Sequence, residues 1–236
     1  MDLRCALALA VILFLMILIP IIFIFQNRSF TGEDLPLMNF KHLLDFFPDM
    51  YFLYAQHQYN SSDDFSTKEL IHLFTNYPII EHYYQVGDSI VNPDGYPRPE
   101  AISKDEFIIL VGGPSAQPCV KYYEDTKQAP IIQKWTDTHI WWETRDGKIA
   151  DETFTPRVDL DEHHDMFIIE FFKDDYGRSI LIYYGHNWQG TLVAGLYFSK
   201  VLYPKISSCD RSYYIFRWVD SNNDAFPDVS EVIGGT

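Results

Sequence analysis

Basic side chains are scarce in this chain. Its 236 residues include 18 Lys and Arg against 33 Asp and Glu, which gives a formal net charge of −15. Proteins that bind nucleic acid neutralise its phosphates with clustered Lys and Arg. The deficit therefore argues against a nucleic-acid partner and favours cations and a solvated surface.

Familiar enzyme motifs are missing as well. The sequence has no G-x-G-x-x-G and no G-x-S-x-G motif, and the turn Gly112-Gly113-Pro114 lacks the Lys and Ser or Thr of a phosphate-binding loop. The aromatic segment His139–Glu143 favours a strand over a zinc-binding H-E-x-x-H helix. Catalytic groups scattered along the chain are not excluded, so enzymatic activity stays open and a non-enzymatic role is favoured.

Cysteine is also rare, with three residues in the chain. Cys5 lies in an N-terminal apolar run, which leaves Cys119 and Cys209 as a pair that can form a disulfide in an oxidising compartment. The alternative is two buried free thiols.

Two Asn-x-Ser sequons, at Asn27 and Asn60, fit a glycosylated external chain.

The longest apolar run predicts a membrane anchor. Cys5–Phe25 is interrupted only by Pro20, and at about 1.5 Å per residue it reaches about 31 Å, enough for a bilayer core. A cleaved signal peptide is the alternative, but no small-residue cleavage site follows the run. We predict a single-pass anchor over residues 1–28, with a short cytoplasmic start and the following domain outside the cell.

Residues 29–100 are predicted to form a helical N-terminal elaboration. Apolar residues recur at helical spacing over Leu37–Phe47, and Ser66–Glu69 forms a capping box for a helix that ends near Asn76. The segment Asn92–Pro99 is rich in Pro and Gly and predicts a connector. A soft subdomain boundary is expected there.

Residues 101–236 are predicted to form an α/β domain with a mixed sheet built from strand-loop-helix units and hairpins. The apolar run Phe107–Val111 leads into a Gly-Gly-Pro turn and a helix, and the pattern returns as a strand, the loop Gly185–Gly190 and the helix Thr191–Leu202. Asp146-Gly147 is a hairpin signal. The expected strands are 107–111, 139–143, 148–154, 166–172, 179–184 and 213–219.

The C-terminal segment Asp220–Glu231 resembles a calcium-binding loop. Oxygen-bearing groups stand at positions 1, 3, 5, 7, 9 and 12 of such a loop. The candidate ligands are Asp220, Asn222, Asp224, the Phe226 carbonyl, Asp228 and Glu231. Ala225 stands where the usual loop has Gly, and flanking helices are missing, so an Asp/Asn-rich turn that caps a strand is the alternative.

Two other polar segments have competing interpretations. Asp159–Asp165 contains two histidines and four acids, but adjacent histidines in a strand point to opposite faces, which favours a solvated loop over a metal site. Gly185–Thr191 precedes a helix, whose N-terminus can hold an anion. A tight structural turn with Thr191 as the N-cap is the favoured alternative.

Several short motifs together resemble archaeal surface-layer and related cell-envelope proteins. They lie within Phe107–Glu231 and comprise Gly112–Pro114, Asp174–Arg178, Gly185–Thr191 and Trp218–Asp224. The resemblance implies an α/β domain displayed outside the cell, glycosylated and calcium-dependent, with a structural role. By position, it carries calcium ligation only to Asp220, Asn222, Asp224, Asp228 and Glu231.

We therefore expect a membrane-anchored cell-surface protein with a structural or interaction role, stabilised by calcium and associated with other cell-envelope proteins. The alternative is a membrane-tethered hydrolase that uses loops 159–165 and 185–188. These loops would then converge in one pocket, with His186 near a carboxylate.

Overall fold

The computed structural model describes residues 38–44, 49–54, 61–74, 78–84, 88–150, 153–224 and 226–235. All of them belong to one unit, Thr31–Thr236, which we describe by itself. The expected anchor Cys5–Phe25 and both sequon asparagines, Asn27 and Asn60, lie outside the described residues. A search of the described ranges finds no helix with the length and apolar character needed to cross a membrane.

A seven-stranded mixed sheet forms the centre of the domain, in the order β10-β9-β7-β8-β3-β1-β2. The four strands β2, β1, β3 and β8 run parallel, and β7, β9 and β10 continue the sheet in antiparallel pairs. The predicted α/β class with a mixed sheet is confirmed. The strands are β1 (Met50–Tyr54), β2 (Ile79–Tyr83), β3 (Phe107–Val111), β7 (His164–Lys173), β8 (Ser179–Gly185), β9 (Tyr213–Val219) and β10 (Val232–Gly235).

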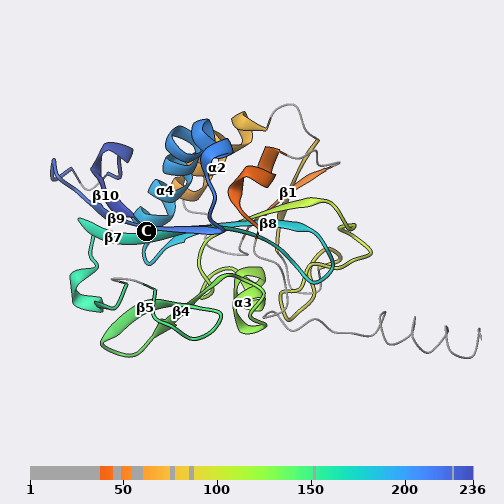
Figure 1. Ribbon diagram of the computed structural model, residues 1–236, viewed down its shortest axis with the longest axis horizontal. Coiled ribbons are helices and arrows are strands. Elements are labelled where there is room, and N and C mark those ends of the chain that lie inside the picture. The colour runs from red at the N-terminus through yellow and green to blue at the C-terminus, as the bar shows by residue number, and fades with distance from the viewer. Residues whose placement is uncertain are drawn as a thin grey trace, which may run out of the picture. The chain divides into compact units, whose positions relative to one another are not determined.

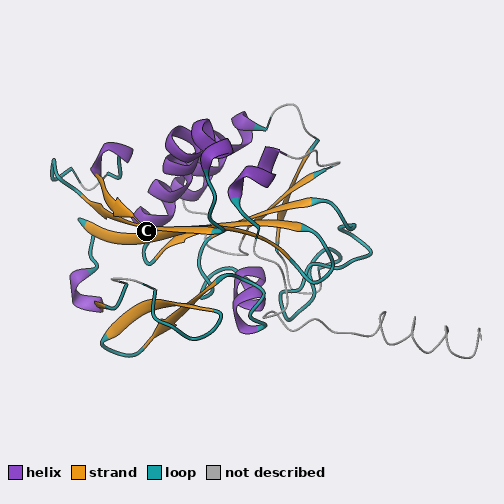
Figure 2. Cartoon of the chain, viewed as in Figure 1, coloured by secondary structure: helices purple, strands orange, loops and turns teal. Residues whose placement is uncertain are grey.

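Helices cover one face of this sheet, and a helix with a second sheet covers the other (Figures 1 and 2). The first layer contains 3₁₀ helix η2 (Phe40–Leu44), α2 (Ser61–Leu73), α4 (Trp188–Tyr197), π-helix η4 (Phe198–Leu202) and 3₁₀ helix η5 (Tyr203–Ser208). The second contains α3 (Pro118–Asp125) and the three-stranded sheet of β4 (Ile131–Trp135), β5 (His139–Thr144) and β6 (Thr155–Pro156). Short 3₁₀ helices, η3 (Arg157–Asp159) and η6 (Val229–Glu231), lie in loops.

Both faces of the large sheet are apolar, which explains its continuous hydrophobic strands. Successive residues of β7 alternate between two buried clusters: Phe167 and Ile169 pack with the α2/α4 layer, and Met166 and Ile168 pack with the α3 layer. All five residues of β3 are buried for the same reason. Strands covered on both faces need uninterrupted apolar sequence rather than alternation.

Two strands come from the segment that was predicted to be helical. Strand β1, Met50–Tyr54, lies between β2 and β3 and is therefore an interior strand of the sheet. Strand β2 forms the sheet edge. Helix α2 crosses between them and begins at Ser61, before the predicted capping box. The segment before residue 101 is therefore part of the same α/β sheet.

The predicted hairpin around Asp146-Gly147 is only partly correct. Gly147 makes the turn with φ +80°, but the described part of the predicted strand, residues 148–150 and 153–154, contains the bridge Glu143↔Ile149 and no strand. The Thr153 hydroxyl bonds to both the N–H and the carbonyl of Trp142, at 3.1 and 3.2 Å. The Thr153 side chain thus replaces a backbone partner on this edge of β5, where regular pairing resumes at β6. Strand β4 pairs with the opposite edge.

The predicted disulfide between Cys119 and Cys209 is wrong. Both thiols are free and buried. Cys119 packs in the cluster on the α3 side of the large sheet, whereas Cys209 packs in the cluster on the α4 side. The sheet separates the two sulfur atoms, so the alternative of two buried thiols describes the structure.

A buried ion pair joins the connector to the β7–β8 turn. Arg178 Nε and Nη2 each lie 2.7 Å from Asp174 Oδ2, and Nη1 donates to the Pro97 carbonyl at 2.7 Å. Asp174 Oδ1 accepts the N–H groups of Tyr176, Gly177 and Arg178 at 2.9–3.1 Å. The Asp-x-Tyr-Gly-Arg motif is therefore a structural clamp.

Candidate functional site

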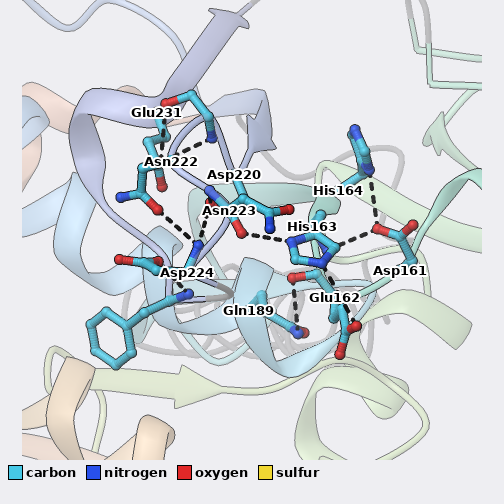
Figure 3. A network of polar contacts seen from close by, with 12 residues as sticks. Asp161, Glu162, His163, His164, Gln189, Asp220, Asn222, Asn223, Asp224 and Glu231 are labelled. Carbon is cyan, nitrogen blue, oxygen red and sulfur yellow. Dashed lines mark hydrogen bonds and ion pairs between the residues drawn. The ribbon is translucent and has the colours of Figure 1, made fainter.

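The C-terminal loop begins at Asp220, directly after β9 (Figure 3). Asp220 Oδ1 accepts the N–H groups of Asn223 at 2.6 Å and Asp224 at 3.3 Å. Its Oδ2 lies 2.6 Å from His163 Nδ1. Asn223 adopts φ +61°, a left-handed conformation that Asn tolerates. Both carboxylate oxygens of Asp220 are thus engaged inside the protein.

Glu231 closes the loop from its other end. Its carboxylate accepts hydrogen bonds from Trp218 Nε1 at 3.1 Å and from the backbone N–H groups of Ser221 and Asp228 at 3.0 and 3.3 Å. Asp228 in turn accepts the Ser230 N–H at 2.7 Å and completes a capping box with Glu231. Glu231 is buried, and its bonds attach η6 to the start of the loop.

Two further predicted calcium ligands, the side chains of Asn222 and Asp224, accept hydrogen bonds from neighbouring backbone groups. Asn222 Oδ1 accepts the Asp224 N–H at 2.9 Å, and Asp224 Oδ1 accepts the Phe226 N–H at 2.8 Å. Across the described ranges, no group of three or more His, Cys, Asp or Glu side chains is arranged to hold a metal ion. These hydrogen bonds match the alternative of an Asp/Asn-rich capped turn, and calcium binding stays a prediction from the sequence.

In the loop 159–165, the His163 side chain turns towards Asp220 and the Asp165 side chain is buried. His163 bonds to Asp220, whereas His164 Nδ1 lies 3.0 Å from the exposed Asp161, so the adjacent histidines have different partners as expected (Figure 3). The hydrogen bond to Asp220 raises the pKa of His163. The loop is therefore not fully solvated, because His163 anchors it to the C-terminal loop.

Asp165 is buried at the N-terminus of α4. Its Oδ2 accepts the N–H groups of Asn187 at 2.9 Å and Gly190 at 2.7 Å, and its Oδ1 accepts those of Met166 and His186 at 2.7 and 3.2 Å. Burial raises the pKa of Asp165 to about 7, and these donors oppose the rise. The chain's own carboxylate thus occupies the predicted anion position.

The start of α4 also differs from the predicted one. The N-cap is Asn187 and the helix begins at Trp188, whereas Thr191 was predicted as the cap. Thr191 Oγ1 instead accepts the Gly185 N–H at 3.0 Å. The favoured alternative, a tight structural turn before the helix, is confirmed, but Asn187 and not Thr191 is the capping residue.

The geometry expected for a hydrolase is not present at His186. Loops 159–165 and 185–188 do meet, through the backbone bonds to Asp165. The His186 ring, however, stacks on Trp142 with ring centres 4.1 Å apart, and its Nδ1 lies 2.9 Å from Gln133 Nε2. Burial lowers the pKa of His186 to about 3. Its ring bonds to an amide rather than a carboxylate, and it is a weak base at neutral pH.

A buried polar network that the sequence analysis missed lies between the two sheets. Glu124 Oε1 accepts the Tyr184 hydroxyl at 2.7 Å, and its Oε2 accepts the Gln133 N–H at 2.9 Å. Trp142 Nε1 donates to the Tyr184 oxygen at 2.9 Å. Burial raises the pKa of Glu124 to about 7. The network joins α3, β4, β5 and β8.

Glu170 is a second buried acid in this layer. Its Oε2 accepts the Ile131 N–H at 3.2 Å, whereas its Oε1 has no hydrogen-bond partner among the described residues. Burial, followed by the nearby Glu124, raises its pKa well above the usual range. The sequence contained a signal for this residue, a single Glu inside the apolar run Phe167–Phe172. A Glu at such a buried position requires a polar partner inside the protein.

Comparison with known proteins gives no assignment: the chain matches no protein-family model and no curated protein. The resemblance to archaeal surface-layer proteins therefore stays a hypothesis that rests on the short motifs. Two of them have structural explanations within this fold, since Asp174–Arg178 forms the buried clamp and Gly185–Thr191 forms the junction with α4.

Proposed function

We propose that this chain is a single-pass membrane protein whose α/β domain lies outside the cytoplasm and has a structural or interaction role at the cell surface. The apolar run Cys5–Phe25 supports the anchor. The acidic composition, with a net charge of −15, supports a solvated and non-nucleic-acid-binding surface. The proposed partners are other cell-envelope proteins.

The observation that carries the structural role is that the acids and histidines considered for catalysis or metal binding form hydrogen bonds within the domain. Asp165 accepts four backbone N–H groups, and Asp220 and Glu231 close the C-terminal loop. His163 and His186 are held by Asp220 and Gln133. Side chains engaged in this way stabilise loops and leave little freedom for substrate chemistry.

An exposed aromatic group supports the interaction role. Phe154 is 51% exposed, stacks on His139 with ring centres 4.5 Å apart and lies 5.3 Å from the Trp141 ring. Val158, two residues after Pro156, the last residue of β6, is 86% exposed. Exposed apolar side chains that gather on one surface are typical of protein interaction sites.

The membrane topology is tested on the full-length chain with a C-terminal tag. We expect the protein in the membrane fraction, with the domain digested by protease added outside intact cells. A variant with Leu13→Arg and Leu15→Arg should leave the membrane, since each Arg costs about 2.5 to 3.5 kcal/mol near a helix centre. A wild-type domain that is soluble, or protected until cells are lysed, would contradict the proposal.

The interaction role is tested by crosslinking on intact cells. We expect crosslinked envelope proteins with wild type and a loss of them with Phe154→Arg. Trp188→Arg, at another aromatic residue that is 40% exposed, is the matched control and should retain them. An unchanged pattern with Phe154→Arg would remove this surface from the proposal.

A further inference from the structure

A cavity of about 210 Å³ lies against α3 and β4, on the side of the large sheet opposite α4. Pro114, in the loop that follows β3, forms part of its wall, so the cavity lies near the carboxyl ends of the parallel strands. Open α/β sheets bind ligands outside these strand ends. The volume is below the range of about 300 to 1,000 Å³ typical of drug-sized ligands, so a small ligand is required.

The cavity combines one aromatic wall with fixed polar groups. Trp135, the last residue of β4, lines it and is 54% exposed. Glu124 and Gln133 line it as well, and both are buried. The Tyr184 hydroxyl and the Gln133 N–H hold the Glu124 carboxylate in place at 2.7 and 2.9 Å. Each Glu124 oxygen retains a further lone pair that can accept a ligand hydroxyl.

The charges around the cavity nearly balance. Lys121 and Lys134 face the acids Asp125 and Glu124, and Lys121 forms an ion pair with Asp125. Such a cavity carries little net charge with which to select an anion or a cation. A neutral ligand with one apolar face and several hydroxyls fits these walls, because an aromatic ring covers the apolar face and carboxylate and amide groups bond the hydroxyls.

We propose that this cavity binds a neutral sugar residue, whose ring stacks on Trp135 while its hydroxyls bond to Glu124 and Gln133. The Glu124 side chain accepts hydrogen bonds from the sugar hydroxyls, and the Gln133 side chain, held by His186 at 2.9 Å, presents its amide at a fixed position. This inference concerns the described domain alone and does not depend on the membrane topology.

The test uses full-length protein in micelles of an amine-oxide detergent, because many common detergents carry sugar headgroups. Glucose, galactose, mannose and N-acetylglucosamine are titrated separately by calorimetry. We expect saturable binding of at least one of them. Trp135→Ala should raise its Kd by about tenfold, the loss expected when one apolar wall is removed.

Trp188→Ala is the matched control, because Trp188 is also exposed, at 40%, but does not line the cavity. It should leave the Kd unchanged. The absence of saturable binding for all four sugars would overturn the proposal, as would equal effects of the two Trp substitutions. Tighter binding of gluconate or glucosamine than of the neutral sugars would overturn the assignment to a neutral ligand.

Discussion

Asp165 and Gly190 meet so closely that only glycine fits at position 190. The Gly190 N–H donates to Asp165 Oδ2 at 2.7 Å, and a Cβ on residue 190 would lie 2.7 Å from Asp165 Cγ. The neighbouring contact is equally close, since a Cβ on Gly185 would lie 2.7 Å from the Thr191 nitrogen. The two glycines let β8 and α4 approach around a buried carboxylate.

Gly190→Ala should therefore destabilise the domain strongly. The added methyl group must displace Asp165, which is buried and makes four backbone hydrogen bonds. We expect a loss of about 3 kcal/mol or more in the free energy of unfolding, measured by denaturant titration of the full-length protein.

Gly147→Ala is the control for this substitution. A Cβ on Gly147 meets nothing within 4 Å, although its φ of +80° disfavours Ala. Its cost should be limited to about 1 to 2 kcal/mol of backbone strain. Equal costs at the two positions would show that the contact with Asp165 is not the cause.

The strands that the sequence predicted best are the ones that are buried on both faces. Phe107–Val111 and Ser179–Tyr184 are continuous apolar runs, and the structure has strands there. Strand β1, Met50–Tyr54, has the same character but was overlooked. The predicted strand 148–154 shows the opposite error, because a turn signal fixes the turn but not the pairing beyond it, which the Thr153 side chain interrupts.

The sequence located the polar loops more reliably than it assigned roles to their residues. Oxygen spacing in Asp220–Glu231 singled out a loop whose carboxylates form hydrogen bonds inside the protein, but spacing does not distinguish a metal ligand from a side chain that accepts backbone N–H groups. The network around Glu124 was missed because its bonds are long-range: Glu124 and Tyr184 are separated by 60 residues. Only the packing of α3 against the face of the large sheet that contains β8 brings them together.

The buried clamp predicts a large loss for Arg178→Met. Arg178 and Asp174 are both fully buried in their side chains, so removal of the guanidinium leaves an uncompensated carboxylate. We expect a cost of about 3 to 5 kcal/mol in the free energy of unfolding. Arg157→Met, at an exposed arginine, is the control and should stay within about 0.5 kcal/mol. Similar small costs for both would contradict the clamp.

The bond between His163 and Asp220 predicts a pH-dependent contribution to stability. The folded protein raises the pKa of His163, so protonation favours folding. The contribution is complete below the unfolded value of about 6.5 and is lost as the pH rises through the folded pKa. The stability advantage of wild type over His163→Gln should therefore be largest at acidic pH and shrink as the pH rises above the unfolded value of about 6.5.

This comparison isolates His163 from other groups. Burial raises the pKa of Glu124 and of Asp165 to about 7, so both favour stability at lower pH, but both remain in the His163→Gln variant. His164→Gln, which removes a bond to the exposed Asp161, is the control and should keep the wild-type pH dependence. A difference between wild type and His163→Gln that does not change with pH would refute the assignment.

The C-terminal loop offers a direct choice between calcium binding and a capped turn. A calcium site would raise the melting temperature as the ion is added, through RT ln(1 + [L]/Kd). The oxygens of Asp220 and Glu231 already accept internal donors, and a calcium ion would have to replace those bonds. We therefore expect wild type to have the same melting temperature with added calcium as with a chelator.

Asp224→Asn and Asp228→Asn test whether the loop binds calcium. Both residues are exposed, and Asn retains the oxygen that accepts the Phe226 or Ser230 N–H. The capped turn predicts that neither change costs more than about 0.5 kcal/mol, with or without calcium. A calcium-induced rise in the wild-type melting temperature that disappears in both variants would establish the ion site, because each substitution removes one anionic ligand and leaves the turn's hydrogen bonds in place.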